Sequence, residues 1–150
     1  MKNNIISGFG AFLCISALAY INSFDESNLW LIPPFGASMV LVMAVHESPL
    51  AHPKNVFFGH LLTALVGIIF VNYIPLPIYI NIALAVGAGV SLMILFNVVH
   101  PPAGGNPIIV IIGSASYDYL INPIIFGCII LLLLAIVINK YLLKKNYPLK

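Results

Sequence analysis

The sequence predicts an all-α integral membrane protein, a helix bundle that contains two broken or half-length helices. The first observation is the composition: 61% of the 150 residues are hydrophobic and 7% are charged, whereas a soluble domain carries about 25% charged residues. The second is a pattern of four long and two short hydrophobic runs. The third is that each short run follows a pair of prolines, Pro33-Pro34 or Pro101-Pro102.

The four long runs are expected to be full transmembrane helices, because about 20 apolar residues cross the hydrocarbon core of a bilayer. They cover residues 5–21, 56–73, 78–99 and 123–139. The short runs cover residues 35–46 and 108–116. A helix of about twelve residues is roughly 18 Å long, too short to cross a core of about 30 Å. We expect one transmembrane domain, residues 1–150, with repeat halves of roughly 5–73 and 74–141.

The order long, short, long occurs twice, which indicates an internal repeat. Sliding the chain by 68 residues places Pro33-Pro34 on Pro101-Pro102, and Phe58-Gly59 on Phe126-Gly127. If each short helix crosses the membrane together with its extended lead-in, each half has three crossings and the halves form a 3+3 inverted repeat. The alternative is four spanning helices and two re-entrant short helices.

The distribution of lysines separates these two arrangements, because lysines are expected on the cytoplasmic side. With six crossings, Lys2, Lys54 and the lysines after residue 139 lie on one side of the membrane, and Asp118 lies on the other. With four crossings, Lys54 changes sides. We therefore favour six crossings, in a bacterial inner membrane, with both termini in the cytoplasm.

The second break, residues 100–107, reads HPPAGGNP and interrupts strongly apolar sequence on both sides. Three prolines and two glycines in this stretch are expected to stop a helix. Inside a bilayer, such a break is tolerated only where protein buries it or where it lines a wet cavity. Asn106 and Pro107 suit the N-cap and the first position of a new helix. The break is therefore a candidate functional site.

Two short helices that begin inside the bilayer are expected to point unpaired amides and positive dipole ends into the membrane interior. If both ends meet near the midplane, they would form an anion-selective constriction. The alternative is that the polar residues only cap helices and the glycines only allow close packing. The candidate pathway residues are Gly36, Ala37, Ser38, His60, Asn97, His100, Pro101, Pro102, Gly104, Gly105 and Asn106.

The two intramembrane histidines each have two interpretations. Protonated, His100 could attract an anion or relay a proton, and neutral, it could bond a carbonyl freed by the prolines. His60 either lines the pathway or is a hydrogen-bonded core residue. Asn97 lies one turn before His100 and is expected to face the same cavity.

Other classes of function fit the sequence less well. A net charge of +2 does not suggest nucleic acid binding, and no Gly-rich phosphate loop for ATP-driven transport is present. Cys14 and Cys128 lie in apolar runs, where we expect buried hydrophobic residues rather than a disulfide or metal pair. We expect no enzymatic activity and no cofactor. The less favoured alternative is a membrane-embedded metal or redox protein, but its histidines match no standard metal-ligand spacing, being His46, His52, His60 and His100.

Residues 100–104, HPPAG, resemble the signature of the HPP family of small integral membrane proteins. Residues 34–41, 48–56 and 59–67 also resemble blocks of this family, and the resemblance covers roughly residues 30–140. It implies a helical membrane protein, usually described with four membrane-spanning helices. Plant members of the family are associated with nitrite transport into chloroplasts. Residues 105–107, GNP, depart from the Ala-Thr-Ala-like continuation of many members.

The residues and the resemblance together predict a transport protein that passes a small monovalent anion, similar to nitrite, between the two short-helix starts. A channel and a proton-coupled carrier are both compatible with the sequence. The alternative is a structural or partner protein without transport activity of its own. Besides the anion and the lipid bilayer, we expect further copies of the chain as partners in a homo-oligomer.

Overall fold

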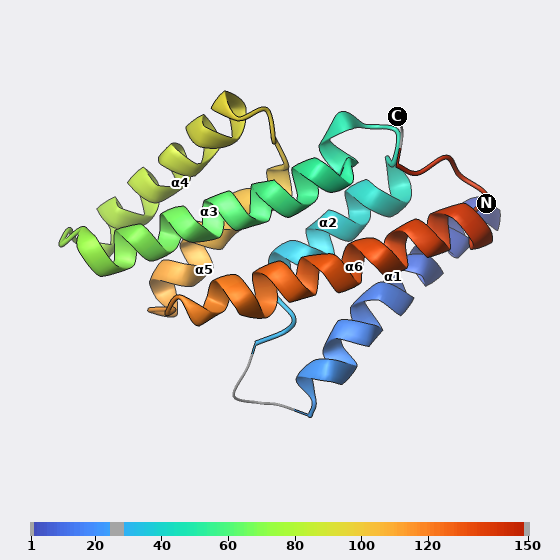
Figure 1. The fold of residues 1–150 in the computed structure, drawn as a ribbon, viewed down its shortest axis with the longest axis horizontal. Helices are drawn as coiled ribbons and strands as arrows, with labels where there is room; N and C mark the ends of the chain where they lie inside the picture. Colours follow the sequence, from blue (N-terminus) through green and yellow to red (C-terminus); the bar gives the residue numbers. More distant parts are fainter. Residues whose placement is uncertain (1, 25–28, 149–150) are drawn as a thin grey trace.

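The computed structural model describes residues 2–24 and 29–148, and every regular element in these ranges is helical (Figure 1). Four stretches are long and apolar enough to cross a membrane, which confirms the predicted all-α membrane fold: Asn4–Asn22, Pro53–Tyr73, Ile78–Leu95 and Leu120–Leu142. The main helices are α1 (Lys2–Asn22), α2 (Pro33–Ala44), α3 (Pro53–Tyr73), α4 (Ile78–Leu95), α5 (Asn106–Ile112) and α6 (Phe126–Val137). Shorter helical turns join or extend them, namely η1 (Pro49–Ala51), η2 (Pro101–Gly105), η3 (Leu120–Ile125) and η4 (Ile138–Leu142).

The second short helix begins earlier than the sequence predicts. Residues Pro101–Gly105 form a 3₁₀ helix that runs directly into α5, so the helical segment starts at Pro101 rather than at Asn106 or residue 108. The prolines do not prevent this, because the first residues of a helix need no intrahelical N–H bond. The resulting segment, Pro101–Ile112, is displaced by 68 residues from α2 at both of its ends. The offset of 68 residues found in the sequence therefore also relates the boundaries of the two short helices.

Helix α4 ends at Leu95, four residues before the predicted end. Asn97 has a φ of 53°, a left-handed conformation that asparagine tolerates better than most residues and that stops a helix. The Val98 amide then bonds the Met93 carbonyl at 2.9 Å. The next residues lead back into the protein, and His100 has an extended backbone at the start of η2.

The two halves of the chain pack in a crosswise pattern. Helix α1 packs against α2 and α6, and helix α4 packs in the equivalent way against α5 and α3. Two glycines of the long helices make equivalent contacts in the two halves. A methyl group added to Gly59 of α3 would lie 2.9 Å from the His100 Cβ and 3.6 Å from the Ala103 Cβ. One added to Gly127 of α6 would lie 2.7 Å from the Phe35 ring. Both glycine contacts are made with the start of a short helix, and Gly59 and Gly127 are 68 residues apart.

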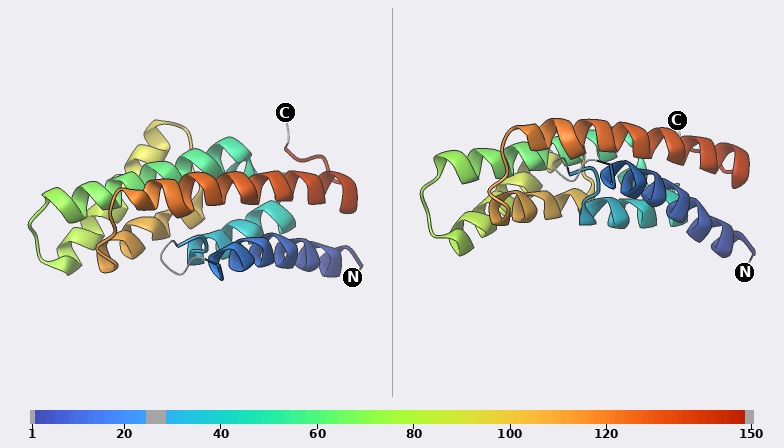
Figure 2. Two further views of the ribbon diagram at one scale, coloured as in Figure 1. Left: turned by 60° about the horizontal axis from the view of Figure 1, so that its bottom comes forward. Right: turned by 90° about the horizontal axis from the view of Figure 1, so that it is seen from below.

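The two short helices begin close together and run apart. Figures 1 and 2 show α2 and α5 starting near the centre of the molecule and running toward opposite ends. A methyl group added to Gly105 would lie 3.3 Å from the Pro34 Cγ, so the two starts are in near contact. Each short helix therefore continues outward from the centre instead of returning to the side from which the chain came. Six membrane crossings stay a prediction, since four of the described helices are long and apolar enough to span a membrane.

Hydrogen bonds define the two ends of the bundle. The Lys145 ammonium donates to the Met43 carbonyl at 2.6 Å and to the Ser7 hydroxyl at 3.3 Å. The Tyr147 hydroxyl donates to the Ala51 carbonyl at 2.8 Å. The start of α1, the end of α2, η1 and the C-terminal segment thus share one end, which we call the lysine end. Tyr73 and Tyr117 are hydrogen-bonded at 3.3 Å at the other end of α3.

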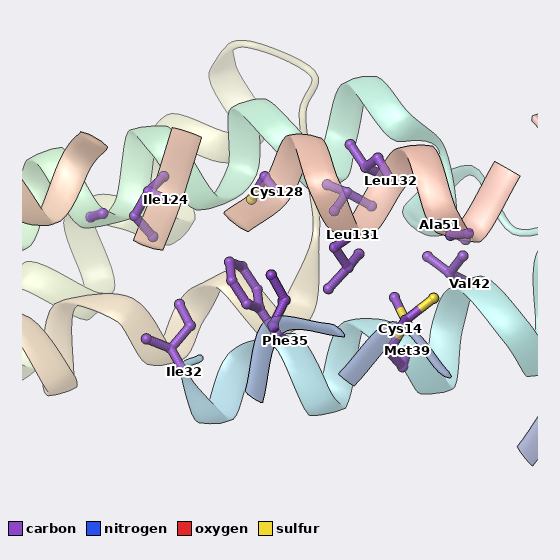
Figure 3. Close-up of a cluster of buried hydrophobic side chains, with 14 of the residues drawn as sticks. Cys14, Ile32, Phe35, Met39, Val42, Ala51, Ile124, Cys128, Leu131 and Leu132 are labelled. Carbon is purple, nitrogen blue, oxygen red and sulfur yellow. The ribbon is translucent and has the colours of Figure 1, made fainter. Parts of the chain in front are cut away.

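The largest hydrophobic core lies where α1, α2 and α6 meet (Figure 3). Phe35 and Val42 of α2 have no exposed surface, and neither has Leu131 of α6. Cys14 and Cys128 belong to the same core as free cysteines, in agreement with the prediction that they are buried hydrophobic residues. This packing fixes α2 against the long helices and so positions the residues near its start.

The close α3–α5 contact gives a first prediction. A methyl group on Gly67 would lie 2.9 Å from the Pro107 Cα, a backbone atom that cannot move aside by rotation of a side chain. We expect Gly67→Ala to lower the free energy of unfolding by about 1–3 kcal/mol, measured by SDS titration in mixed micelles. Gly87→Ala is the matched control, because Gly87 has nothing within 4 Å. A neutral Gly67→Ala would contradict the described helix contact.

The six-crossing arrangement gives a second prediction, on orientation. In a background of Cys14→Ala and Cys128→Ala, we expect Lys54→Cys and Lys144→Cys to react with a membrane-impermeant thiol reagent from the cytoplasmic side only. Asp118→Cys should react from the opposite side only. Labelling of Lys54→Cys and Lys144→Cys from different sides would contradict the shared lysine end.

Candidate functional site

Four buried polar side chains meet where the two short helices begin. Ser38 lies on α2, His60 on α3, His100 just before η2, and Asn106 at the start of α5. None of the four has exposed surface. All four are among the residues that sequence analysis selected, and the fold brings them together from parts of the chain up to 68 residues apart.

Ser38 joins the two histidines. Its Oγ lies 2.9 Å from the His60 Nε2 and 2.8 Å from the His100 Nε2. The two imidazole rings are 5.0 Å apart between centroids, and the His60 ring also contacts the Phe35 ring edge-to-face at 5.2 Å. The histidines are therefore linked through one hydroxyl group rather than bonded directly to each other.

The Nδ1 nitrogen of each histidine, which does not contact Ser38, has its own partner. The His100 Nδ1 lies 2.8 Å from the Leu50 carbonyl oxygen. The His60 Nδ1 lies 3.0 Å from the Asn106 Nδ2. That amide nitrogen also lies 3.1 Å from the His60 carbonyl and 3.0 Å from the Thr63 hydroxyl. The result is one continuous chain of contacts, which we call the histidine chain: Leu50 carbonyl, His100, Ser38, His60 and Asn106.

The partners fix the protons of the uncharged histidine chain. A carbonyl only accepts, so the His100 Nδ1 carries hydrogen and the His100 Nε2 is an acceptor. The Asn106 Nδ2 only donates, so the His60 Nδ1 is an acceptor and the His60 Nε2 carries hydrogen. The His60 Nε2–H then donates to the Ser38 Oγ, and the Ser38 hydroxyl donates to the His100 Nε2. All donors in the chain point in the same direction.

Ser38 and Asn106 occupy equivalent positions of the repeat, 68 residues apart, and they flank the two nitrogens of the His60 ring. The repeat equivalent of His60 itself is Cys128, which lies in the hydrophobic core. The fold is thus pseudo-symmetric, but the polar site belongs to one side of it.

The double prolines remove backbone N–H groups that could bind an anion at the starts of the two short helices. Pro33 and Pro34 have no N–H groups, and the Phe35 amide bonds the Ile32 carbonyl at 3.0 Å. In the second half, Pro101 and Pro102 likewise have no N–H groups, and the Ala103 amide bonds the His100 carbonyl at 3.0 Å. The expected unpaired amides are therefore missing from both starts. The side chains of the histidine chain are the polar groups at this position.

The glycines and prolines of the candidate set lie around the histidine chain rather than in it. Gly36 and Ala37 lie on the exposed face of α2, and Gly36 borders a shallow cavity of about 370 Å³ against α1. Gly104 is half-buried with no atom within 4 Å of an added methyl group. The remaining three form the backbone of the break, with Pro101 exposed and Pro102 and Gly105 half-buried.

Asn97 does not face His100, contrary to the expectation from its spacing. It is exposed and borders a surface cavity of about 300 Å³ at the lysine end. We call this cavity the vestibule; its lining residues are His46, Glu47, Ser48, Pro49, His52, Lys54, Asn55 and Asn97. The left-handed backbone at Asn97 ends the helical periodicity on which the expectation depended.

The vestibule approaches the histidine chain at the loop that carries η1. Ser48 and Pro49 line the vestibule, and the next residue, Leu50, supplies the carbonyl that bonds His100. The Asn55 side chain, also in the vestibule wall, donates to the Val99 carbonyl at 3.1 Å. One loop therefore separates a polar surface cavity from the buried histidines.

The charges of the vestibule are mixed. Partial burial, followed by the nearby Lys145 ammonium, lowers the pKa of His46, while Glu47 opposes this shift. The His46 Nε2 and a Glu47 carboxylate oxygen lie 4.0 Å apart. Lys54 is exposed at the rim. His46 and His52 lie here and not with His60 and His100, so the four histidines form two separate pairs.

Thr63 and the Leu50 carbonyl were not predicted from the sequence as parts of the site. Thr63 lies three residues after His60 on α3, a helical spacing that places both on one face. This spacing was the available signal for Thr63. No side-chain pattern could have indicated a backbone carbonyl from a loop 50 residues away from His100.

The fold and the site define a polytopic helical membrane protein with two half-length helices and a buried histidine chain at their starts. Comparison with known proteins identifies the family. The family described as "HPP, transmembrane region" matches residues 1–148, so the chain belongs to the HPP family. No solved structure shows significant similarity.

Two relatives from Dictyostelium discoideum, each named a transmembrane protein, are similar to the chain. One is 33% identical over 151 residues, which cover 96% of this chain and 53% of the relative. The other is 29% identical over 150 residues, which cover 95% and 48%. The chain thus spans about half the length of these curated relatives.

The buried amide of Asn106 gives a third prediction. Asn106→Leu keeps the approximate volume but removes the donor to the His60 Nδ1, the His60 carbonyl and Thr63. We expect a loss of about 1–3 kcal/mol in the free energy of unfolding, measured by SDS titration. Asn72→Leu is the control, because at this exposed position of α3 the change removes only the donor to the Ile68 carbonyl of the same helix. Equal effects of both substitutions would contradict the described hydrogen bonds.

Proposed function

We propose that this protein transports a small monovalent anion, similar to nitrite, across the membrane, and that the histidine chain lies on its route. The observation that carries the proposal is the pair of buried histidines joined through Ser38 at the starts of two half-length helices. Ionisable residues inside a membrane are costly and usually mark a substrate or proton pathway. Transporter sites also commonly lie at discontinuous helices between repeat halves.

The vestibule supports a route from the lysine end. It has hydroxyl, amide and imidazole groups that can hydrogen-bond an anion, and Lys54 gives its rim a positive charge. From there only the loop that carries η1 separates a solute from His100. Movement of this loop would connect the vestibule to the histidine chain.

The burial of the site favours a carrier over an open channel. Ser38, His60, His100 and Asn106 have no exposed surface, so a solute reaches them only if helices or the loop move. Alternating access of this kind fits two inverted halves packed around a central site. Nitrite is proposed as the representative substrate because of the plant members of the HPP family.

A second candidate is a structural membrane protein without transport activity. The observation in its favour is that the histidine chain also links α2, α3, η1 and η2, as a purely structural bond network would. The exposed face of α2, with Gly36, Ala37 and Val40, would allow close packing against a second copy of the chain. We propose homo-oligomers under both candidates.

Nitrite flux through the wild-type protein separates the two candidates, and removal of the His100 imidazole gives a fourth prediction. We expect nitrite flux into liposomes with purified protein, and at least a tenfold lower flux for His100→Ala, because a site hydrogen bond of about 1.4 kcal/mol corresponds to about a factor of ten. Tyr79→Ala, an exposed position on α4, serves as the control. Unchanged flux in His100→Ala would remove His100 from the mechanism, and wild-type liposomes impermeable to nitrite under all gradients would favour the structural candidate.

A further inference from the structure

The Ser38 hydroxyl has one more neighbour than the uncharged histidine chain uses. Besides the two imidazoles, its Oγ lies 3.0 Å from the Pro34 carbonyl oxygen. A hydroxyl has one hydrogen to donate and two lone pairs that accept. In the uncharged chain it donates to His100 and accepts from His60, so one lone pair is unused and the Pro34 carbonyl receives nothing from it.

One added proton completes this arrangement. If a proton from water binds the His100 Nε2, that nitrogen becomes a donor to the Ser38 Oγ. The Ser38 hydrogen turns to the Pro34 carbonyl, and the oxygen accepts from both histidines. Three hydrogen bonds at 2.8–3.0 Å then use the one hydrogen and both lone pairs. His100 gains one proton and one positive charge, its Nδ1–H stays on the Leu50 carbonyl, and no covalent bond to carbon changes.

His60 has no equivalent place for the proton. Its free acceptor, Nδ1, faces the Asn106 Nδ2, which is a donor. Turning the Asn106 amide over would place its oxygen 3.1 Å from the His60 carbonyl oxygen and remove the donor to Thr63. The added proton therefore belongs on His100.

Among residues 2–24 and 29–148, no carboxylate lies within the site to stabilise the charged form. Among the described residues that pack against His100, α3 contributes one titratable group, His60, while α2 contributes the Ser38 hydroxyl and η1 the Leu50 carbonyl. The charged and titratable groups of the vestibule, His46, Glu47, His52 and Lys54, lie on the far side of the η1 loop. Helix α2 and the Pro101–Ile112 segment both start here, so their positive dipole ends oppose a lone cation.

We propose that the proton is the coupling ion of this transporter and that it moves together with one monovalent anion. His100 carries the proton, and the Ser38 hydroxyl rotates so that its oxygen accepts the new hydrogen bond. The inference rests on the proposed anion transport. A buried imidazolium without a counter-ion is costly, and an anion beside His100 supplies the missing negative charge. Proton and anion therefore bind together, and one complete transfer moves no net charge. Ser38 acts as a positioning residue for the proton on His100.

The test uses the full chain in liposomes that contain a pH-sensitive dye, with an inward nitrite gradient. Valinomycin and potassium set the membrane potential, and protein-free liposomes give the background of passive nitrous acid permeation. We expect the lumen to acidify by one proton per nitrite, at a rate that does not change with the membrane potential. A nitrite flux that carries current and leaves the lumenal pH unchanged would overturn the inference but not the proposed function. No nitrite flux under any gradient would overturn the proposed function itself.

Variants of Ser38 test its role. We expect Ser38→Ala, which removes the shared oxygen, to lower coupled flux at least tenfold, and Ser38→Thr, which keeps the hydroxyl, to retain most of it. Ser91→Ala is the matched control, because Ser91 is exposed on α4. Unchanged coupling in a folded Ser38→Ala protein would refute the hydroxyl switch. If Ser38→Ala does not fold, loss of coupling in a folded Ser38→Thr protein would refute it equally.

Discussion

The structure depends on the requirement that polar groups inside a lipid bilayer find partners within the protein. Two helices start in the middle of this molecule, where no water is available to their first amides. The chain meets the requirement in two ways. Proline pairs remove the amides that would be unpaired, and the Ser38, His60, His100 and Asn106 side chains bond one another and the Leu50 carbonyl. Helices α3 and α6 pack closely on the starts of the short helices through Gly59 and Gly127.

The two short helices are related by an offset of 68 residues, yet the polar site around them is one-sided. Equivalent positions of the two halves supply Ser38 and Asn106, but the His60 position has become Cys128 in the second half. His100 enters from the extended segment before η2, where the first half has Ile32, a core residue. The backbone framework is thus shared between the halves, and a few side chains decide that the polar chain faces the vestibule at the lysine end.

Much of the fold could be predicted from the sequence, because hydrophobic length and proline pairs are local signals. The end of α4 could not, since the apolar run continues past Leu95 and does not indicate that Asn97 adopts a left-handed conformation. The predicted start of the second short helix is too late, because prolines stop helices in general but are accepted in the first turn. Ser38, His60, His100 and Asn106 stood out as polar residues in apolar runs. The sequence could not predict the order in which these four residues contact one another, the outward position of Gly36 and Ala37, or the separate location of Asn97. Helices that are apolar all round give no indication of which face meets protein and which meets lipid.

The early end of α4 also affects the surrounding bilayer. Its 18 residues correspond to a helix of about 27 Å, shorter than a typical hydrocarbon core of about 30 Å, whereas the neighbouring α3 has 21 residues. Such hydrophobic mismatch is relieved by local thinning of the bilayer or by a change in helix tilt, each at a modest energetic cost. Because α4 is followed by the segment that carries His100, we expect acyl-chain length in the host membrane to affect the position of this histidine.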